Sequence, residues 1–408
     1  MTLRRFSLAV GLAVSLAAAA CHNDELMPPA APAYAGGAMF ERYVSLGNSI
    51  TAGFQSGGIN DSTQRQAYPV LVAAAMGGQP FYYPSLNPPG CPPPYTNIFT
   101  GIRLGTGSTA TTCYFRASTP PYVSNLGVPS AQVLDILQNG PGAGTNSNAL
   151  TQIILGGRTQ IKAMTDARPT FVSVWIGNND VLGSVLSPTN SGDSTLITPV
   201  ATFQTQYQQV VDAVKATGAK AILVGVANVT EIPYASQGQA YYSVKYTPPG
   251  TAFPTNFLVG ANCAPSGMGG KGDSVLVPFP FGAGLIGLAL ANPGTTYTLA
   301  CTEPQTVQPA ELRKILTTVA AYNTFISGAA TTNSWAYLDP NPTLDSLRAF
   351  QTQVAPFPNL QAACSGSPFG LAFSCDGFHP SGPTHRLIAQ HLVQAINAKY
   401  GSAIPAVP

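Results

Sequence analysis

The chain has 408 residues, of which 45% are apolar and only 8% are charged, against about 25% charged residues in an average soluble domain. Its formal net charge of +2 comes entirely from Arg4 and Arg5, which lie in a segment that we expect to be cleaved, so the mature chain would be neutral. This balance argues against nucleic acid as a partner, because phosphate binding needs clustered lysines and arginines.

The first twenty residues are typical of a secretory signal peptide. They have a short basic start, an apolar run from Phe6 and small residues at the end, and the run is too short for a membrane span. The stretch from Leu16 to Cys21 resembles the processing site of bacterial lipoproteins, in which the signal is cut before the cysteine and its sulfur carries a diacylglyceryl group. Ala18 stands where that site usually has leucine. The resemblance implies an exported protein, anchored through Cys21 to a membrane of the bacterial cell envelope on the periplasmic or surface side. Ordinary secretion with an unpaired cysteine is the alternative.

The cysteine count supports an oxidising compartment. Of the 7 cysteines, removal of Cys21 leaves an even number. Paired as sequence neighbours, these are Cys91 with Cys113, Cys263 with Cys301, and Cys364 with Cys375. This pairing predicts three disulfides and is one of about 15 possible connectivities. Metal binding is the competing interpretation, but no Cys-x-x-Cys or His-Cys cluster exists, so we expect no metal and no cofactor.

Short apolar runs, each ending in Gly, Asn or Pro, predict buried parallel strands. In chain order they are Arg42–Leu46, Gln79–Tyr83, Thr170–Ile176, Lys220–Val226 and Trp335–Leu338. Helical patterns lie between them. These are Tyr68–Met76, Ser130–Gln138 with a capping Ser130, Val200–Thr217, Ala310–Ile326 and Pro383–Tyr400.

Alternating strands and helices predict a three-layer α/β fold, with a central five-stranded parallel sheet covered by helices on both faces. We expect a signal peptide over residues 1–20, the lipidated cysteine and a flexible Pro/Ala/Gly-rich tether over 21–40, and one domain over 41–402. Two stretches, about 84–126 and 230–309, break the alternation. They are rich in Pro, Gly and aromatic residues, which predicts insertions near the active-site edge.

Ligands of an open parallel sheet bind beyond the carboxyl ends of its strands, so the residues that follow each strand are the candidates for chemistry. Ser49 follows the first strand. A hydroxyl is a poor nucleophile unless a base removes its proton, and imidazole suits that role near neutral pH. Of the 4 histidines, His379 alone lies in a loop three residues after a carboxylate, Asp376, which can fix its tautomer. His385 and His391 fall within the last helical pattern and read as surface or packing residues.

A tetrahedral intermediate also needs hydrogen-bond donors for its oxyanion. The candidates are the N–H of Ser49, the side-chain amide of Asn179 and the N–H of Gly127. Asp180 reads as a structural residue that caps the following turn, and Asp339, at the end of the fifth strand, is a rival for the triad acid.

Together these residues resemble the GDSL, or SGNH, hydrolase superfamily. Its four sequence blocks correspond, in order, to Gly47-Asn48-Ser49-Ile50, Gly127, Gly177 to Asp180, and Asp376-Gly377-Phe378-His379. The surrounding sequence is most similar to bacterial lipoprotein members. The resemblance implies a flavodoxin-like sheet, a Ser–His–Asp triad and an oxyanion hole of Ser49, Gly127 and Asn179. Asn48 departs from the aspartate usual before the serine, which puts the rigidity of that loop in doubt rather than the chemistry.

The sequence thus predicts a monomeric serine esterase of lipase type, acting on a small-molecule, glycan or lipid ester. A polysaccharide O-deacetylase with the same triad is the alternative, and a non-catalytic surface binding module is a third.

Overall fold

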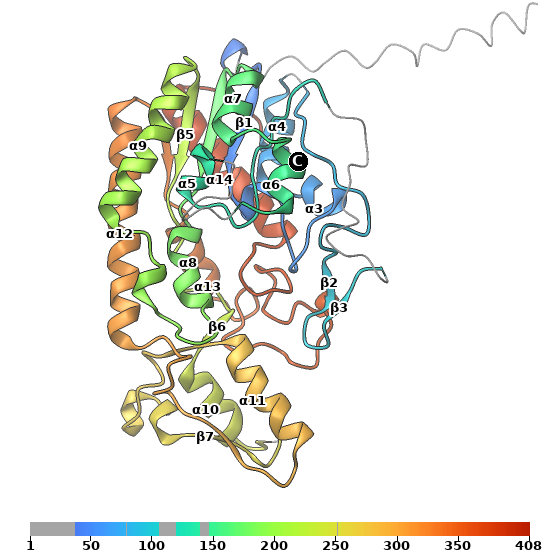
Figure 1. The fold of residues 1–408 in the computed structure, drawn as a ribbon, viewed down its shortest axis with the longest axis vertical. Helices are drawn as coiled ribbons and strands as arrows, with labels where there is room; N and C mark the ends of the chain where they lie inside the picture. Colours follow the sequence, from blue (N-terminus) through green and yellow to red (C-terminus); the bar gives the residue numbers. More distant parts are fainter. Residues whose placement is uncertain (1–36, 79, 106–119, 139–146, 251) are drawn as a thin grey trace, which may run out of the picture. The chain divides into compact units, whose positions relative to one another are not determined.

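A computed structural model of the protein describes residues 37–78, 80–105, 120–138, 147–250 and 252–408. Four strands form a parallel sheet in the order β1 (Tyr43–Gly47), β4 (Phe171–Trp175), β5 (Lys220–Val224) and β10 (Ala336–Leu338) (Figure 1). In register, Ser45 lies beside Ser173, Ser173 beside Ile222, and Ile222 beside Ala336. The expected α/β class and parallel sheet are confirmed.

The expectation of a strand over Gln79–Tyr83, the second in chain order, is wrong for the part that the structure describes, because residues 80–83 form no strand. The segment Ser124–Leu126 lies beside β1 in its place. The N–H of Ser45 donates to Ser124 at 2.8 Å, and the N–H of Leu126 donates back to Ser45 at 2.9 Å. The carbonyl of Tyr82 accepts from Ser124 instead of pairing with β1, so this edge holds only an isolated bridge between Ser45 and Asn125.

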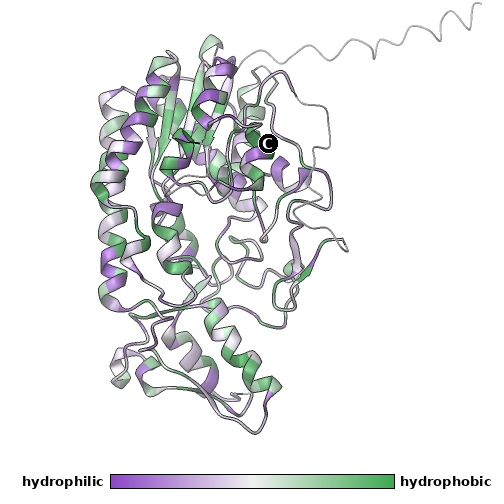
Figure 2. Ribbon diagram, viewed as in Figure 1, coloured by the Kyte–Doolittle hydropathy of each residue, from purple (hydrophilic) through white to green (hydrophobic). Residues whose placement is uncertain are grey.

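Helices cover both faces of the sheet. Alternate residues of a strand point to opposite faces, so Phe171 and Ile222 pack with α4 (Tyr68–Met76) and α14 (Gly382–Tyr400). Val172 and Leu223 pack on the other face, against the helices α5 (Val133–Leu137), α7 (Gln160–Ala167), α9 (Val200–Ala216) and α12 (Pro309–Thr332). The strands are accordingly green in Figure 2, whereas the outer helices alternate between green and purple.

The expected helices over 68–76, 200–217 and 383–400 match α4, α9 and α14 to within one residue at each end, whereas α12 begins near the expected residue and continues to Thr332, beyond the expected end at Ile326. The expected capping role of Ser130 is wrong. Ser130 has a φ of 70° and lies in a turn, and α5 begins after Gln132, whose N–H donates to Asp135. The remaining helices are α2 (Ser49–Ala52), α3 (Asp61–Arg65), α6 (Ala149–Leu155), α8 (Asn179–Leu186), α10 (Gly238–Tyr246), α11 (Phe279–Ala291) and α13 (Asn341–Arg348), with 3-10 turns at Gly37–Phe40, Ser194–Leu196, Ala261–Cys263, Ser266–Met268 and Cys364–Gly366.

Small sheets occupy the two stretches that interrupt the alternation. The first holds the antiparallel pair β2 (Tyr95–Asn97) and β3 (Ile102–Arg103). The second holds the antiparallel pair β6 (Ala235–Gln237) and β8 (Leu276–Pro278) and the parallel pair β7 (Phe257–Val259) and β9 (Tyr297–Leu299). The second stretch also has an apolar cluster around Tyr241, Phe257 and Ile286.

Two of the three expected disulfides are confirmed. Cys263 is bonded to Cys301 and Cys364 to Cys375, each with Cα atoms 5.1 Å apart. Cys113, Cys21, the signal peptide and most of the tether lie outside the described residues, so those expectations stay predictions. No helix in the described ranges combines the length and the apolar character that crossing a bilayer requires.

Candidate active site

A pocket of about 100 Å³ lies at the carboxyl ends of all four strands of the sheet. Ser49 reaches it from β1, Asn178 from β4, Asn228 from β5 and Pro340 from β10. Most of the remaining wall is apolar, with Leu182, Ile232, Leu344, Leu347, Phe373 and Phe378 among its side chains. This is the edge at which open parallel sheets bind ligands.

Ser49 is held at a sharp strand-to-helix turn. It is the first residue of α2, separated from β1 by Asn48 alone, and its N–H therefore has no acceptor within the helix. Asn48 caps the turn, because its Oδ1 accepts from the N–H of Ile50 at 3.0 Å. Gly47 has to be glycine, since a Cβ there would lie 2.6 Å from the carbonyl oxygen of Trp175. Among the described residues, no hydrogen bond engages the Ser49 hydroxyl, and the side chain lines the pocket.

His379 and Asp376 form a buried pair beside the same pocket. Nδ1 of His379 donates to Oδ2 of Asp376 at 2.8 Å, and the residues are 4% and 3% exposed. Burial alone would raise the pKa of Asp376. The facing His379 and backbone N–H donors outweigh it and hold the pKa of this carboxyl below its usual value. An ionised carboxylate only accepts hydrogen bonds, so Nδ1 of His379 carries the proton and Nε2 is left as a base.

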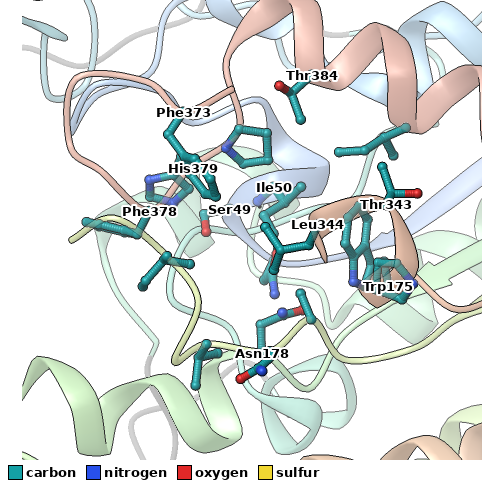
Figure 3. Close-up of a pocket in the computed structure, with 18 of the residues that line it drawn as sticks. Ser49, Ile50, Trp175, Asn178, Thr343, Leu344, Phe373, Phe378, His379 and Thr384 are labelled. Atoms are coloured by element: carbon teal, nitrogen blue, oxygen red, sulfur yellow. Dashed lines mark hydrogen bonds between the residues drawn. The ribbon is translucent and has the colours of Figure 1, made fainter. Parts of the chain in front are cut away.

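Hydrogen bonds join the loop after Ser49 to the loop that carries the base. The N–H of Gly57 donates to Oδ2 of Asp376 at 2.7 Å, although the two residues are 319 positions apart in the chain. The N–H of Ser56 donates to the hydroxyl of Ser374 at 2.8 Å, and the Phe54 ring lies 5.0 Å from the His379 ring. Figure 3 shows the side chains of Ser49 and His379 next to one another at one side of the pocket. They are not hydrogen-bonded to each other in this structure, and such bonds are often long before substrate binds.

The two other expected oxyanion donors differ in position. Asn179 lines the pocket, and its Nδ2 donates one proton to the carbonyl of Ala131 at 2.8 Å, which leaves the second proton available. Gly127 is buried and does not line this pocket. Its N–H donates to Oδ1 of Asn125 at 3.1 Å, and a Cβ on it would lie 2.6 Å from the N of Ala52. Gly127 therefore permits close packing against α2 and does not present its N–H to the pocket.

The two other carboxylates that the sequence singled out, Asp339 and Asp180, form hydrogen bonds with other parts of the chain. Oδ1 of Asp339 accepts from the backbone and the side chain of Asn341, and Nδ1 of His379 is bonded to Asp376 instead. Burial raises the pKa of Asp180 to about 7, although hydrogen bonds from Thr198 and from the N–H of Val133 oppose this shift. Its bond to Val133 caps the start of α5, an earlier helix, and not the turn that follows Asp180, so its role is structural but its capping partner differs from the expected one.

The two helical histidines have different environments. His385 is fully buried, its Nδ1 accepts from the N–H of Tyr68 at 3.3 Å, and burial lowers its pKa to about 3. His391 lines the pocket and bonds to Thr343 at 2.8 Å. The sequence reasoning missed His391, because helical periodicity does not distinguish a packed face from one that borders a cavity.

Trp175 and Asn178 also line the pocket and were not anticipated as site residues. Trp175 ends β4 and reads as core from the sequence, and it is indeed 3% exposed. The available signal was its place two residues before the Gly177–Asp180 motif. In the described ranges, no group of three His, Cys, Asp or Glu side chains is arranged to hold a metal ion.

No family model matches the chain, and no curated protein matches it in sequence. Among solved structures, Axe2, an acetylxylan esterase from Geobacillus stearothermophilus, aligns with a TM-score of 0.38 and 13% identity over 87% of this chain and 94% of that chain. LAE5, an α/β hydrolase enzyme from the metagenome of Lake Arreo, aligns with a TM-score of 0.37 and 13% identity over 88% of this chain and 99% of that chain. The acetyl xylan esterase AlAXEase aligns with a TM-score of 0.34 and 12% identity over 87% and 99% of the two chains. Likeness at this level carries no argument about activity.

Proposed function

We propose that this chain is a serine hydrolase that cleaves carboxylic esters through an acyl-enzyme on Ser49. The observation that carries the proposal is the buried Asp376–His379 pair beside a pocket that Ser49 also lines. An oriented imidazole next to a hydroxyl with no other partner is the arrangement that nucleophilic catalysis by serine requires.

In the first half of the reaction, Nε2 of His379 takes the proton of the Ser49 hydroxyl while its oxygen attacks the ester carbonyl carbon. The resulting imidazolium is stabilised by the ionised Asp376, whose lowered pKa keeps it charged. When the tetrahedral intermediate collapses, the C–O bond to the alcohol breaks and His379 gives its proton to the leaving oxygen. Ser49 is left acylated.

In the second half, His379 deprotonates a water molecule that attacks the acyl carbon. Collapse of this second intermediate releases the carboxylic acid and returns the proton to Ser49. The negative charge on the carbonyl oxygen needs donors in both halves. The N–H of Ser49, which has no helical acceptor, and the second amide proton of Asn179 supply them. This mechanism assigns no oxyanion role to Gly127.

The apolar wall of the pocket favours esters in which the bound group is uncharged. Burying a charge beside Leu182, Ile232 and Leu344 without a partner would cost several kcal/mol, in the range of about 3–5 kcal/mol for an uncompensated ion. An alkanoyl ester avoids this cost and gains from burial of its methylenes, at about 0.8 kcal/mol for each.

We further propose that the enzyme acts outside the cytoplasm. The two disulfides support this location, because such bonds persist in oxidising compartments. Lipidation at Cys21 rests on the sequence resemblance alone. Incorporation of labelled palmitate into the wild-type chain but not into Cys21→Ala is the expected result, and equal incorporation would contradict it.

The mechanism is tested with Ser49→Ala. We expect kcat for 4-nitrophenyl butyrate to fall by about 10⁶-fold, and labelling by a fluorophosphonate probe to disappear. Ser346→Ala is the matched control, because Ser346 is exposed on α13 and its hydroxyl donates only to the carbonyl of Pro342. Turnover by Ser49→Ala at the wild-type rate would remove Ser49 from the mechanism.

A further inference from the structure

Two side chains in the wall of the active-site pocket each have one buried polar atom with no hydrogen-bond partner among the described residues. They are Trp175, whose Nε1 is a donor, and Asn178, whose Oδ1 is an acceptor. Both residues are deeply buried, at 3% and 6% exposure. Buried polar groups are paired in the great majority of cases, so two unpaired groups in one small pocket call for a physical reason.

Apart from the Ser49 hydroxyl, which the proposed reaction uses, several polar side chains of the same wall are already engaged. Thr343 bonds to His391 at 2.8 Å, and Oδ1 of Asn228 accepts from the N–H of Thr230 at 3.1 Å. Nδ2 of Asn179 donates to Ala131 at 2.8 Å. The unpaired state of Trp175 and Asn178 is therefore not a general property of this wall.

Both residues belong to one short segment. Trp175 is the last residue of β4, and Asn178 follows three positions later, directly before α8. Gly47 lies beside Trp175 in the sheet register, so this segment is the immediate neighbour of the turn that carries Ser49. Figure 3 shows Trp175 and Thr343 across the pocket from Ser49 and His379. A group bound to this segment therefore lies in the same pocket as the reacting ester.

We propose that Trp175 and Asn178 form a subsite for a hydroxyl group of the substrate. The indole N–H donates only, and an amide oxygen accepts only, whereas a hydroxyl both accepts and donates. A carbonyl or ether oxygen would serve Trp175 alone, and an alkyl group would leave both unpaired. The inference rests on the proposed ester hydrolysis and narrows its substrate class to hydroxyl-bearing esters.

The hydroxyl can belong to either half of the ester, and two substrate pairs separate these sources. The acyl side is tested with 4-nitrophenyl 3-hydroxybutyrate against 4-nitrophenyl butyrate. The alcohol side is tested with glycerol monoacetate against propyl acetate, with acid release followed by pH-stat. One net hydrogen bond corresponds to about a tenfold preference in kcat/KM, so we expect about tenfold or more for the hydroxylated ester in one of the pairs.

Trp175→Phe and Asn178→Ala are the test variants. Each is expected to reduce the hydroxyl preference toward one, because each removes one partner of the bound group. Trp335→Phe is the matched control. Trp335 is 5% exposed in the core and does not line the pocket, so this variant loses an indole without changing the preference. Melting temperatures of all three variants separate loss of folding from loss of selectivity.

The outcomes separate the two proposals. Hydrolysis of 4-nitrophenyl butyrate with a preference close to one in both pairs would overturn the subsite and leave the serine mechanism standing. A preference that survives unchanged in both Trp175→Phe and Asn178→Ala would also overturn it. Absence of any hydrolysis or fluorophosphonate labelling in the wild type would overturn the subsite and the proposed function together.

Discussion

Replacement of Asp376 by asparagine is expected to remove most of the activity while the fold persists. Oδ1 of Asp376 accepts from the Ser374 hydroxyl and from two backbone N–H groups, and Oδ2 accepts from the N–H of Gly57 and from Nδ1 of His379. An amide has one acceptor oxygen, which best serves the three donors on the Oδ1 side. Its NH₂ group then faces Gly57 and His379.

Two consequences follow from that orientation. His379 has to turn Nδ1 into an acceptor, so the ring proton moves to Nε2 and the base for Ser49 is lost. In a serine protease, the corresponding change lowers kcat by about 10⁴-fold, and we expect a similar loss here. The N–H of Gly57 is left facing another donor, which should cost about 1–3 kcal/mol of unfolding free energy.

The assay is kcat for 4-nitrophenyl butyrate, with urea unfolding of the same samples. Asp339→Asn is the control, because Asp339 bonds only to Asn341 among the contacts described and does not line the pocket. Wild-type kcat in Asp376→Asn would refute the role of this carboxylate. A large loss in Asp339→Asn instead would assign that role to the rival residue.

Two further predictions concern stability. The buried His385 has a pKa of about 3 when folded and about 6.5 when unfolded, so its contribution is complete above pH 6.5 and is lost as pH falls toward 3. We measure the free energy of unfolding in urea for the wild type and for His385→Asn. The difference between them should shrink by up to about 1.4 kcal/mol per pH unit as pH falls over that range. A difference that stays constant with pH would contradict this. Replacing both Cys263 and Cys301 by alanine opens a loop with a sequence separation of 38 and should cost about 4 kcal/mol. Protease nicking within residues 238–301 is the readout, and unchanged resistance in the double variant would contradict the estimate.

Apolar runs and helix periodicity predicted the centre of the fold because the strands are buried on both faces. β4, β5 and β10 lie within the expected ranges, β1 ends one residue beyond its expected range, and α4 begins and ends at the expected residues. The prediction of a strand over Gln79–Tyr83 was wrong because an aromatic run does not determine which segment its backbone forms hydrogen bonds with. The helix α11 was not anticipated because its apolar residues show no helical alternation.

The sequence predicts the part of the candidate site in which the interacting residues lie close together in the chain. Asp376 and His379 lie three residues apart, and their hydrogen bond agrees with the sequence expectation. The subsite residues Trp175 and Asn178 were not predictable, because burial in a core and burial beside a cavity leave the same apolar pattern. The expected role of Gly127 depended on the direction of one N–H, which only the surrounding backbone determines.

The hydrogen bonds between the Ser56–Gly57 turn and residues 374–376 have a consequence for biosynthesis. The last strand of the four-stranded sheet ends at Leu338, so all four strands are synthesised before the loop that carries His379 and before α14. On the proposed mechanism a chain without that loop is inert, because the imidazole arrives last. Hydrolytic competence therefore requires that residues 374–379 have been synthesised and have docked against the turn that follows Ser49.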